Sequence, residues 1–363
     1  MRRILKGLGI GLFFLLVAVC LAIALVPPFL DRIYYRGPVS AHFDGQHFFN
    51  PDGEQGTGGS QASARNPSRF LRFFLRTDRA PWPESVAVTP AKPTARVAGG
   101  AMRVTWIGHA SALVQVDGLN ILTDPIWSEV ASPFPPLGPG RVRAPGIRFD
   151  DLPKIDLVLV SHNHYDHMDL PTLKRLWDRD RPLIVTSLGN DTILKANGID
   201  AVARDWGQAV PVKPGVRVVV ERVHHWGSRW GVDRNRALWS GFTVVLPGGN
   251  FYTAGDTGPG DLRWPMDTAS RGPLRLALIP IGAFRPRAMM SGNHIGPVEA
   301  VQVFERSRAA HALAMHWGTF QLSNEAIDEP PALLAATLRA RGIAPGRFRA
   351  VEVGVPWDVP AMR

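Results

Sequence analysis

The pattern of apolar and polar residues divides the chain into an apolar N-terminal run, a polar middle segment and a long region of short apolar runs. In that third part the runs are rich in β-branched residues, which is typical of buried strands. Helical periodicity follows some of them, as at 297–308. Strand pairs interspersed with helices predict an α/β fold. The predicted strands are 104–107, 112–116, 120–123, 155–160, 183–186, 216–221, 242–246, 251–253, 276–280 and 312–315.

The first 26 residues form a basic head followed by an uninterrupted apolar run. Arg2, Arg3 and Lys6 precede the 20 residues at 7–26, which is the length of a helix that crosses a bilayer. Because basic flanks stay cytoplasmic, this pattern predicts a single-pass transmembrane anchor, with the remaining chain on the far, periplasmic or extracytoplasmic side. A cleaved signal peptide is the alternative, since Ala-Ile-Ala at 22–24 resembles a cleavage site. The length of the run favours the retained anchor.

Residues 27–100 indicate a linker and pre-domain segment, and residues 101–363 indicate one folded domain. Gly, Ser, Asn and Pro dominate 53–68, which is typical of a flexible linker. An apolar helical face interleaved with arginines follows, made of Phe70, Phe73 and Phe74. This face can lie on a membrane surface or pack on the domain, and packing on the domain is the simpler alternative.

Charge and cysteine content narrow the partners and the chemistry. The chain carries 41 Lys and Arg against 31 Asp and Glu, a net charge of +10 that favours anionic surfaces such as phospholipid headgroups or nucleic acid. Its single cysteine, Cys20, excludes an internal disulfide framework and a cysteine zinc cage. Because Cys20 lies inside the apolar run, a catalytic thiol is not expected.

The strongest chemical signal is the motif H-x-H-x-D-H, which starts at His162 directly after the apolar run 155–160. In extended backbone, residues i and i+2 point the same way, so His162 and His164 can hold one metal ion together. The chain then turns, and Asp166 and His167 can reach a second ion nearby. Imidazole and carboxylate ligands without thiolate suit zinc, with iron or manganese as alternatives. The motif therefore predicts a metal site at the end of a buried strand.

Five short motifs follow one another in the predicted domain: TWIGHA at 105–110, LTDP at 122–125, SHNHYDH at 161–167, AGDTG at 254–258 and HWGTF at 316–320. Together they resemble the metallo-β-lactamase superfamily and, within it, the N-acyl-phosphatidylethanolamine-hydrolysing phospholipase D branch. The resemblance extends roughly from residue 101 to the C-terminus. The segments HFDG at 42–45 and FFNP at 48–51 also resemble bacterial members of this branch. The resemblance implies a four-layer αββα sandwich.

The resemblance also supplies the complete ligand set for two metal ions per chain. The implied ligands are His162, His164 and His225 for one zinc ion, Asp166, His167 and His316 for the other, and Asp256 as the bridge. His224 is the alternative to His225, because both follow the strand 216–221. All of these ligands then lie at strand ends, and we expect them to meet along one edge of the sheets.

Several residues are expected to act around this centre. Asp166, besides ligating, is expected to orient the attacking water and carry its proton. His294 matches a histidine that this branch associates with the substrate pocket, and a solvent-facing histidine at a helix entry is the alternative. Asp124 is expected to support the ligands from behind, and His109 to be a buried structural histidine rather than a ligand. The candidates for binding a substrate phosphate, on a proline-rich loop, are Arg141, Arg143 and Arg148.

The predicted function is a membrane-anchored, dinuclear zinc phosphodiesterase of phospholipase D type, acting on N-acyl-phosphatidylethanolamine-like phospholipids. Two ions lower the pKa of a shared water and neutralise the charge that builds on a phosphoryl oxygen. Hydrolysis of a lactone, amide or β-lactam is the alternative, since the same centre attacks carbonyls. No nucleic-acid partner is expected of an exported chain. The sequence leaves open whether the protein forms a homodimer.

Overall fold

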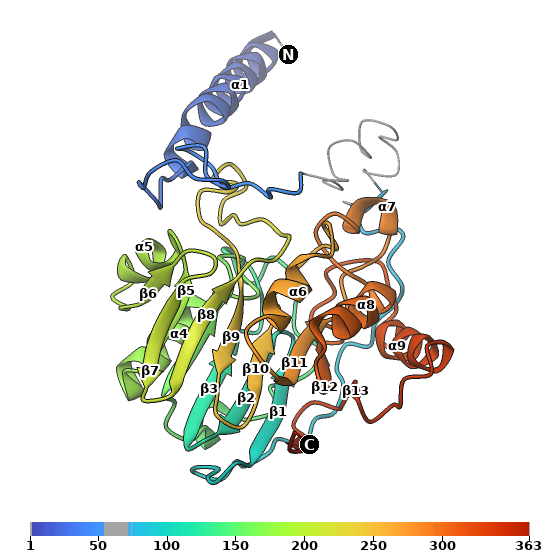
Figure 1. Ribbon diagram of the computed structural model, residues 1–363. Coiled ribbons are helices and arrows are strands. Elements are labelled where there is room, and N and C mark those ends of the chain that lie inside the picture. Colours follow the sequence, from blue (N-terminus) through green and yellow to red (C-terminus); the bar gives the residue numbers. More distant parts are fainter. Residues whose placement is uncertain (1, 54–71, 74, 363) are drawn as a thin grey trace.

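A computed structural model gives the structure of residues 2–53, 72–73 and 75–362. Within these residues, two sheets of seven strands each pack face to face, and helices cover their outer faces (Figure 1). The predicted α/β sandwich is therefore confirmed.

The four strands that the sequence did not predict are the four edge strands. The first sheet has the order β14-β1-β2-β3-β4-β5-β6 and the second β13-β12-β11-β10-β9-β8-β7, so β14, β6, β13 and β7 lie at the edges. The first sheet consists of β1 (Met102–Gly108), β2 (Ser111–Val116), β3 (Leu119–Thr123), β4 (Leu157–Val160), β5 (Leu183–Ser187), β6 (Val202–Arg204) and β14 (Pro356–Val359). The second consists of β7 (Ala209–Lys213), β8 (Val216–Glu221), β9 (Gly241–Val245), β10 (Asn250–Thr253), β11 (Leu274–Pro280), β12 (His311–Met315) and β13 (Phe348–Arg349).

The two sheets repeat one topology. Strands β1, β2 and β3 are antiparallel, and β3 to β6 are parallel. In the second sheet β7 to β10 are antiparallel, and β10 to β13 are parallel. The carboxyl ends of parallel strands meet at the same edge of a sheet. The loops that follow β3, β4, β10 and β12 carry most of the predicted ligands, so this topology gathers them.

Strand β4, which leads into the metal motif, is apolar along its whole length because both of its faces are buried. Leu157 and Leu159 belong to the core between the sheets, whereas Val158 and Val160 pack under α4 against Leu173. Fully burying one such side chain contributes about 1.5–3 kcal/mol, so the strand is held firmly from both sides. The histidines that follow it therefore start from a rigid base.

Helices flank the sandwich and help to form the loops of the site. The helices predicted near 171 and at 297–308 are both present, as α4 and α8. Asp169 stands at the N-cap position of α4, but its carboxylate accepts hydrogen bonds from the backbone of Trp127 and Ser128. The helices are α1 (Arg2–Leu30), α4 (Leu170–Asp180), α5 (Asn190–Lys195), α6 (Trp264–Ala269), α7 (Arg287–Met290), α8 (Pro297–Ser307) and α9 (Glu329–Ala340), with a 3-10 turn at Phe149–Asp151.

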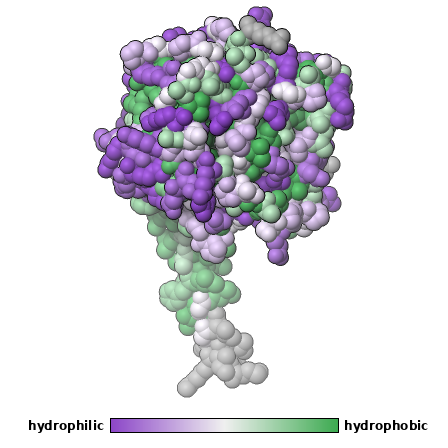
Figure 2. Space-filling view, turned by 90° about the horizontal axis from the view of Figure 1, so that it is seen from below, coloured by the Kyte–Doolittle hydropathy of each residue, from purple (hydrophilic) through white to green (hydrophobic). Residues whose placement is uncertain are grey.

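Helix α1 projects from the body of the molecule and carries exposed apolar side chains such as Phe13 and Leu16 (Figures 1 and 2). Among the residues that the structure describes, no helix is both long enough and apolar enough to cross a membrane. The apolar run at 7–26 is described only in part, because the side chains at positions 8, 23 and 24 lie outside the description. The structure thus does not support the transmembrane anchor predicted for residues 1–26, nor the topology derived from it.

The segment after α1 packs on the sandwich. Phe43 and Phe48 are buried in the core, and short bridges join Val86 to Arg143 and Ala91 to Ile147. The division at residue 100 between a pre-domain segment and a folded domain stays a prediction. Phe70, Phe74 and nearly all of the predicted linker at 53–68 lie outside the described residues.

Candidate metal centre

The predicted ligands converge at the sheet edge in three overlapping groups. In each group, one ligand atom per residue lies within 4.8 Å of the others. The groups are His162, His164, His225 and Asp256; His109, Asp166, His167 and His316; and Asp256, His294 and His316. Every ligand predicted from the sequence is present in at least one group. His109 was not predicted as a ligand and is nevertheless part of one.

In the first group, the ring nitrogens of three imidazoles face one another. Nε2 of His162 lies 2.7 Å from Nδ1 of His164, and Nε2 of His225 lies 3.4 Å from the same Nδ1. Nδ1 of His225 donates to the backbone carbonyl of Asn293 at 2.9 Å, which leaves Nε2 free to bind a metal ion. The other candidate, His224, turns its ring away and donates Nδ1–H to Asp52. The structure thus places His225, and not His224, in the group.

Asp256 lies between this group and the second one. Its Oδ1 is 3.1 Å from Nε2 of His316, and its Oδ2 is 3.2 Å from Nε2 of His167 and 3.8 Å from Nε2 of His225. Asp166 faces the second group from the other side, with Oδ2 3.4 Å from Nε2 of His316. A carboxylate in this position is close to the histidines of both groups, and the bridging role predicted for Asp256 stays a prediction.

Asp124 holds the metal motif from behind. Its buried carboxylate accepts hydrogen bonds from the backbone N–H and the hydroxyl of Ser161, both at 2.7 Å, and from Nδ1 of His167 at 2.9 Å. The last of these bonds leaves Nε2 of His167 facing Asp256. Such a partner fixes the tautomer and the orientation of a ligating imidazole.

Strained backbone accompanies the site. His109, Asp124 and His316 all have positive φ, at 55°, 33° and 62°, although none is a glycine. The turns that carry His109 and His316 are joined, since the N–H of His316 donates to the carbonyl of His109 at 2.9 Å. Residues in this region of φ cluster at functional sites, where the surrounding structure maintains the strain.

Burial keeps the histidines of the first group neutral. It lowers the pKa of His162 and of His225 well below the ordinary value, and lowers the pKa of His164 to about 4. Burial disfavours the charge of Asp166 and Asp256 as well, but the neighbouring imidazoles hold the pKa of both carboxyls well below its ordinary value. Neutral imidazoles and ionised carboxylates are the forms that bind a divalent cation.

Several buried ligand atoms also have no hydrogen-bond partner among the described residues. These atoms are Nε2 of His164, His167 and His316, and Oδ1 of Asp256. Buried polar atoms are normally satisfied, so unpartnered ligand atoms within these groups fit metal ions as the missing partners. The donor set of imidazole and carboxylate groups suits zinc.

Comparison with known proteins assigns the family. Residues 119–317 match the Beta-lactamase superfamily domain. The chain belongs to the metallo-β-lactamase superfamily. The N-acyl-phosphatidylethanolamine-hydrolyzing phospholipase D 1 of Caenorhabditis elegans is 36% identical over 266 residues, which cover 70% of this chain and 75% of the nematode protein. A metal-dependent hydrolase of Pyrobaculum neutrophilum is 28% identical over 244 residues, which cover 66% of this chain and 95% of that protein.

A solved structure has the same fold. A metallo hydrolase of Ignicoccus hospitalis superposes with a TM-score of 0.55 at 20% identity, covering 72% of this chain and 99% of its own. Together with the relatives, this match identifies the chain as a metal-dependent hydrolase of the superfamily that resembles its N-acyl-phosphatidylethanolamine-hydrolysing phospholipase D branch.

The side chain of His294 points toward the candidate metal centre rather than into solvent. Its Nδ1 lies 3.7 Å from Oδ2 of Asp256, and its side chain is only 13% exposed. Burial lowers the pKa of His294 to about 4, so the ring is neutral at pH 7. The predicted catalytic roles of His294 and Asp166 stay predictions, and the position of both residues fits them.

The three arginines predicted to bind phosphate are engaged by protein groups. Arg141 is half-buried and donates to the backbone carbonyls of Ile126 and Ser128. Arg143 pairs with Glu352 at 2.6 Å and lies over the ring of Trp317. Arg148 is exposed and pairs with Asp151. Their role in binding substrate stays a prediction, and their contacts indicate that they shape the proline-rich loop.

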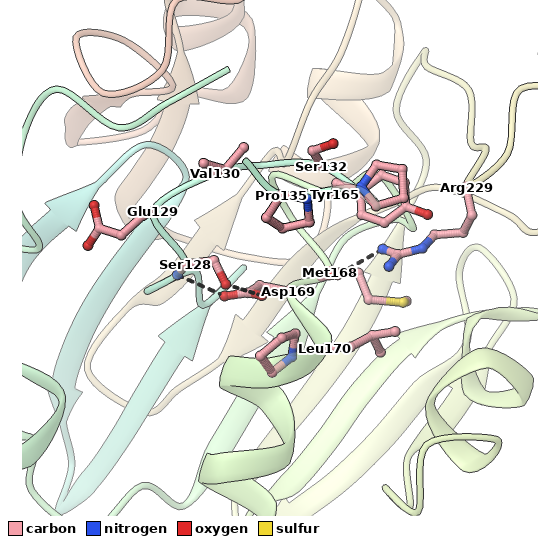
Figure 3. Close-up of a pocket in the computed structure, with 12 residues that line it drawn as sticks. Ser128, Glu129, Val130, Ser132, Pro135, Tyr165, Met168, Asp169, Leu170 and Arg229 are labelled. Atoms are coloured by element: carbon pink, nitrogen blue, oxygen red, sulfur yellow. Dashed lines mark hydrogen bonds between the residues drawn. The ribbon is translucent and has the colours of Figure 1, made fainter. Parts of the chain in front are cut away.

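An apolar cavity of about 380 Å³ lies beside the metal motif, between the proline-rich loop and the start of α4 (Figure 3). Tyr165 and Met168, which flank Asp166 and His167 in sequence, form part of its wall. Arg229 forms another part, stacks 3.7 Å from the ring of Tyr165 and donates to the carbonyl of Met168 at 2.9 Å. The remaining lining residues are Ser128, Glu129, Val130, Ser132, Pro133, Pro135, Asp169, Leu170 and Pro171. Sequence reasoning missed this cavity because Arg229 comes from a distant part of the chain.

Proposed function

We propose that the protein is a dinuclear zinc phosphodiesterase of phospholipase D type that hydrolyses N-acyl-phosphatidylethanolamine-like phospholipids. The observation that carries the proposal is the position of Asp256 between two groups of histidines. The 36% identity to a phospholipase D of this specificity supports the choice of substrate.

The ligand assignment follows the two groups. His162, His164 and His225 would hold one ion, and Asp256 would bridge to the ion held by Asp166, His167 and His316. When bound, two such ions lower the pKa of a water and offset the negative charge of a phosphoryl group. Iron or manganese would be accepted by the same donor types.

The residues of the chain itself orient the reactants. Asp166, held by a hydrogen bond from His109, would orient the attacking water and accept its proton. His294 is neutral and lies beside Asp256, where it can hydrogen-bond to a substrate oxygen. Asp124 keeps His167 in one orientation throughout.

The cavity favours a substrate with an apolar chain. Its wall is mostly Pro, Val, Leu, Met and Tyr, and two exposed apolar side chains, Phe134 and Leu137, stand on the same loop. A lipid can place an acyl chain there while its phosphate lies at the metal ligands 162–167. The net charge of +10 favours approach to an anionic lipid surface.

In the proposed reaction, water adds across the phosphorus–oxygen bond on the headgroup side. A new P–OH bond gives phosphatidic acid, and the N-acylethanolamine leaves with its hydroxyl group restored by a proton. Purified protein incubated with N-acyl-phosphatidylethanolamine, with and without a chelator, tests the proposal by mass spectrometry of the products. Chelator-sensitive release of phosphatidic acid is expected. Lactone or β-lactam opening without phospholipid turnover would move the enzyme to the carbonyl-hydrolysing class.

A further inference from the structure

Residues 31–53, here called the N-terminal strap, lie across the loop at 222–240 that carries His225. Asp31 pairs with Arg236 at 2.6 Å, and the hydroxyl of Tyr34 donates to the buried carboxylate of Asp233 at 2.7 Å. The strap lies outside the region that matches the superfamily domain, 119–317. Its sequence motifs HFDG and FFNP have no part in the proposed chemistry.

Two residues at the end of the strap, Asn50 and Asp52, contact the loops that carry the predicted metal ligands. Nδ2 of Asn50 donates to the backbone carbonyl of His225 at 2.9 Å, and Oδ1 of Asn50 accepts from the indole N–H of Trp239 at 3.2 Å. Asn50 is buried, so this carbonyl has no water to replace the amide. The ring of the same His225 is held by Asn293. Hydrogen bonds therefore fix both the backbone carbonyl and the imidazole ring of His225.

Asp52 joins two loops that carry ligands. Its carboxylate accepts from Nδ1 of His224 at 3.1 Å and from the backbone N–H of Asp261 at 2.8 Å. His224 directly precedes His225, and its carbonyl accepts from the N–H of Gly258 at 2.6 Å. Asp52 therefore connects the loop of His225 to the loop that follows Asp256.

We propose that Asn50 and Asp52 are positioning residues for the metal centre, and that the strap sets the separation between His225 and Asp256. This inference rests on the metal centre proposed above, but not on its substrate. Partners that orient ligands from outside typically affect metal affinity by about 10–100-fold when they are removed. The two strap residues belong to this class, although they precede the motif His162–His167 by more than 100 residues.

The anchoring of the strap and its positioning role are separable. Phe43 and Phe48 are buried in the core and hold the strap in place, whereas Asn50 and Asp52 reach the loops with polar groups. Asp44 offers a matched control on the same strap. Among the described residues, its exposed carboxylate accepts hydrogen bonds only from the backbone of Gln46 and His47, within its own turn.

The test is a zinc titration of the chelator-treated full chain against a chromophoric competitor. Asn50→Ala and Asp52→Ala should raise the dissociation constant of one zinc ion by about 10–100-fold, and Asp44→Ala should leave both constants unchanged. In cobalt-loaded protein the same two variants should alter the visible absorption bands, which a loss of stability alone would not do. If Asp52→Ala does not fold, Asp52→Asn and Asn50→Ala decide the question.

Wild-type zinc affinity and an unchanged cobalt spectrum in folded Asn50→Ala and Asp52 variants would overturn the proposal. An equal loss of affinity in Asp44→Ala would do the same, because it would reduce the effect to general destabilisation. Phospholipid turnover is not used as a readout. Failure of the proposed substrate therefore leaves this test intact.

Discussion

Nε2 of His109 donates a hydrogen bond to Oδ2 of Asp166 at 2.8 Å. His109 is buried and Asp166 is half-buried at the metal centre, and burial lowers the pKa of His109 to about 3, so the donor is a neutral imidazole. The backbone carbonyl of His109 also accepts from the N–H of His316. His109 therefore links a residue of the metal motif to a ligand from the other sheet.

The first prediction concerns this link. His109→Ala should lower kcat/KM by about 10–100-fold, because Asp166 loses the partner that orients it. His109→Gln, whose amide can still donate to Asp166, should retain more activity than the alanine variant. His311→Ala provides a histidine substitution at the start of β12, outside the three groups, and should behave as the wild type. Steady-state kinetics of the three variants, with zinc content measured in parallel, test the prediction. A kcat/KM of His109→Ala equal to that of the wild type would contradict it.

The second prediction concerns metal dependence. Prolonged treatment with a chelator should abolish hydrolysis, and added zinc should restore it, since the proposed nucleophile is a water that the ions activate. Asp256→Ala and His167→Ala should lower the bound metal and abolish turnover, because they remove the bridge and a ligand. Asp191→Ala on α5 is the matched carboxylate control. Elemental analysis gives the metal content, and full activity of a metal-free sample would exclude this centre as the catalyst.

The third prediction concerns the stability of metal-free protein, which should be greatest near pH 6.5. Burial lowers the pKa of His109 to about 3 and of His164 and His294 to about 4, below the ordinary value of 6.5. Between these values the unfolded chain binds more protons than the folded one, so the free energy of unfolding falls as the pH falls.

On the alkaline side the sign is reversed. Burial opposes the positive charge of His316, but the neighbouring Asp256 and Asp166 raise its pKa to about 9. The folded protein then holds a proton that the unfolded chain has lost, and this stabilisation disappears as the pH rises from 6.5 through about 9. Zinc replaces that proton, so zinc-loaded protein should not show the alkaline decrease. Thermal unfolding midpoints of both forms across this range test the prediction, and a midpoint of the metal-free form that kept rising to pH 9 would refute it.

The sequence predicted the interior of the fold well and its margins poorly. Strands β4 and β11 are buried along their whole length, and such apolar runs can be recognised from the sequence alone. The edge strands are short and partly exposed, and β7 contains Pro211. Their pairing depends on partners far away, as when β14 joins β1 through Val104 and Trp357. Local periodicity carries no information on such pairing.

The site shows the same division. His162, His164, Asp166 and His167 are adjacent in sequence, so their spacing alone indicates a metal site. His109 was predicted to be a buried structural histidine, but its partner was not predicted, because the sequence does not show that folding places it beside Asp166. The three arginines were predicted to bind phosphate because of their charge. A sequence does not reveal that the guanidinium of Arg141 donates its hydrogen bonds to backbone carbonyls.

The last prediction concerns the apolar cavity. Val130→Glu places a carboxylate in the mainly apolar wall of the cavity, where an acyl chain would have to displace or desolvate it. The KM for a long-chain N-acyl-phosphatidylethanolamine should therefore rise about tenfold, which corresponds to about 1.4 kcal/mol of binding free energy. A small soluble phosphodiester such as bis(p-nitrophenyl) phosphate does not need the cavity, so its kcat/KM should be unchanged. Val298→Glu on the exposed side of α8 makes the same change in charge away from the cavity and should affect neither substrate. Equal losses for both substrates in Val130→Glu would indicate damage to the metal centre, and no loss for either would show that the acyl chain binds elsewhere.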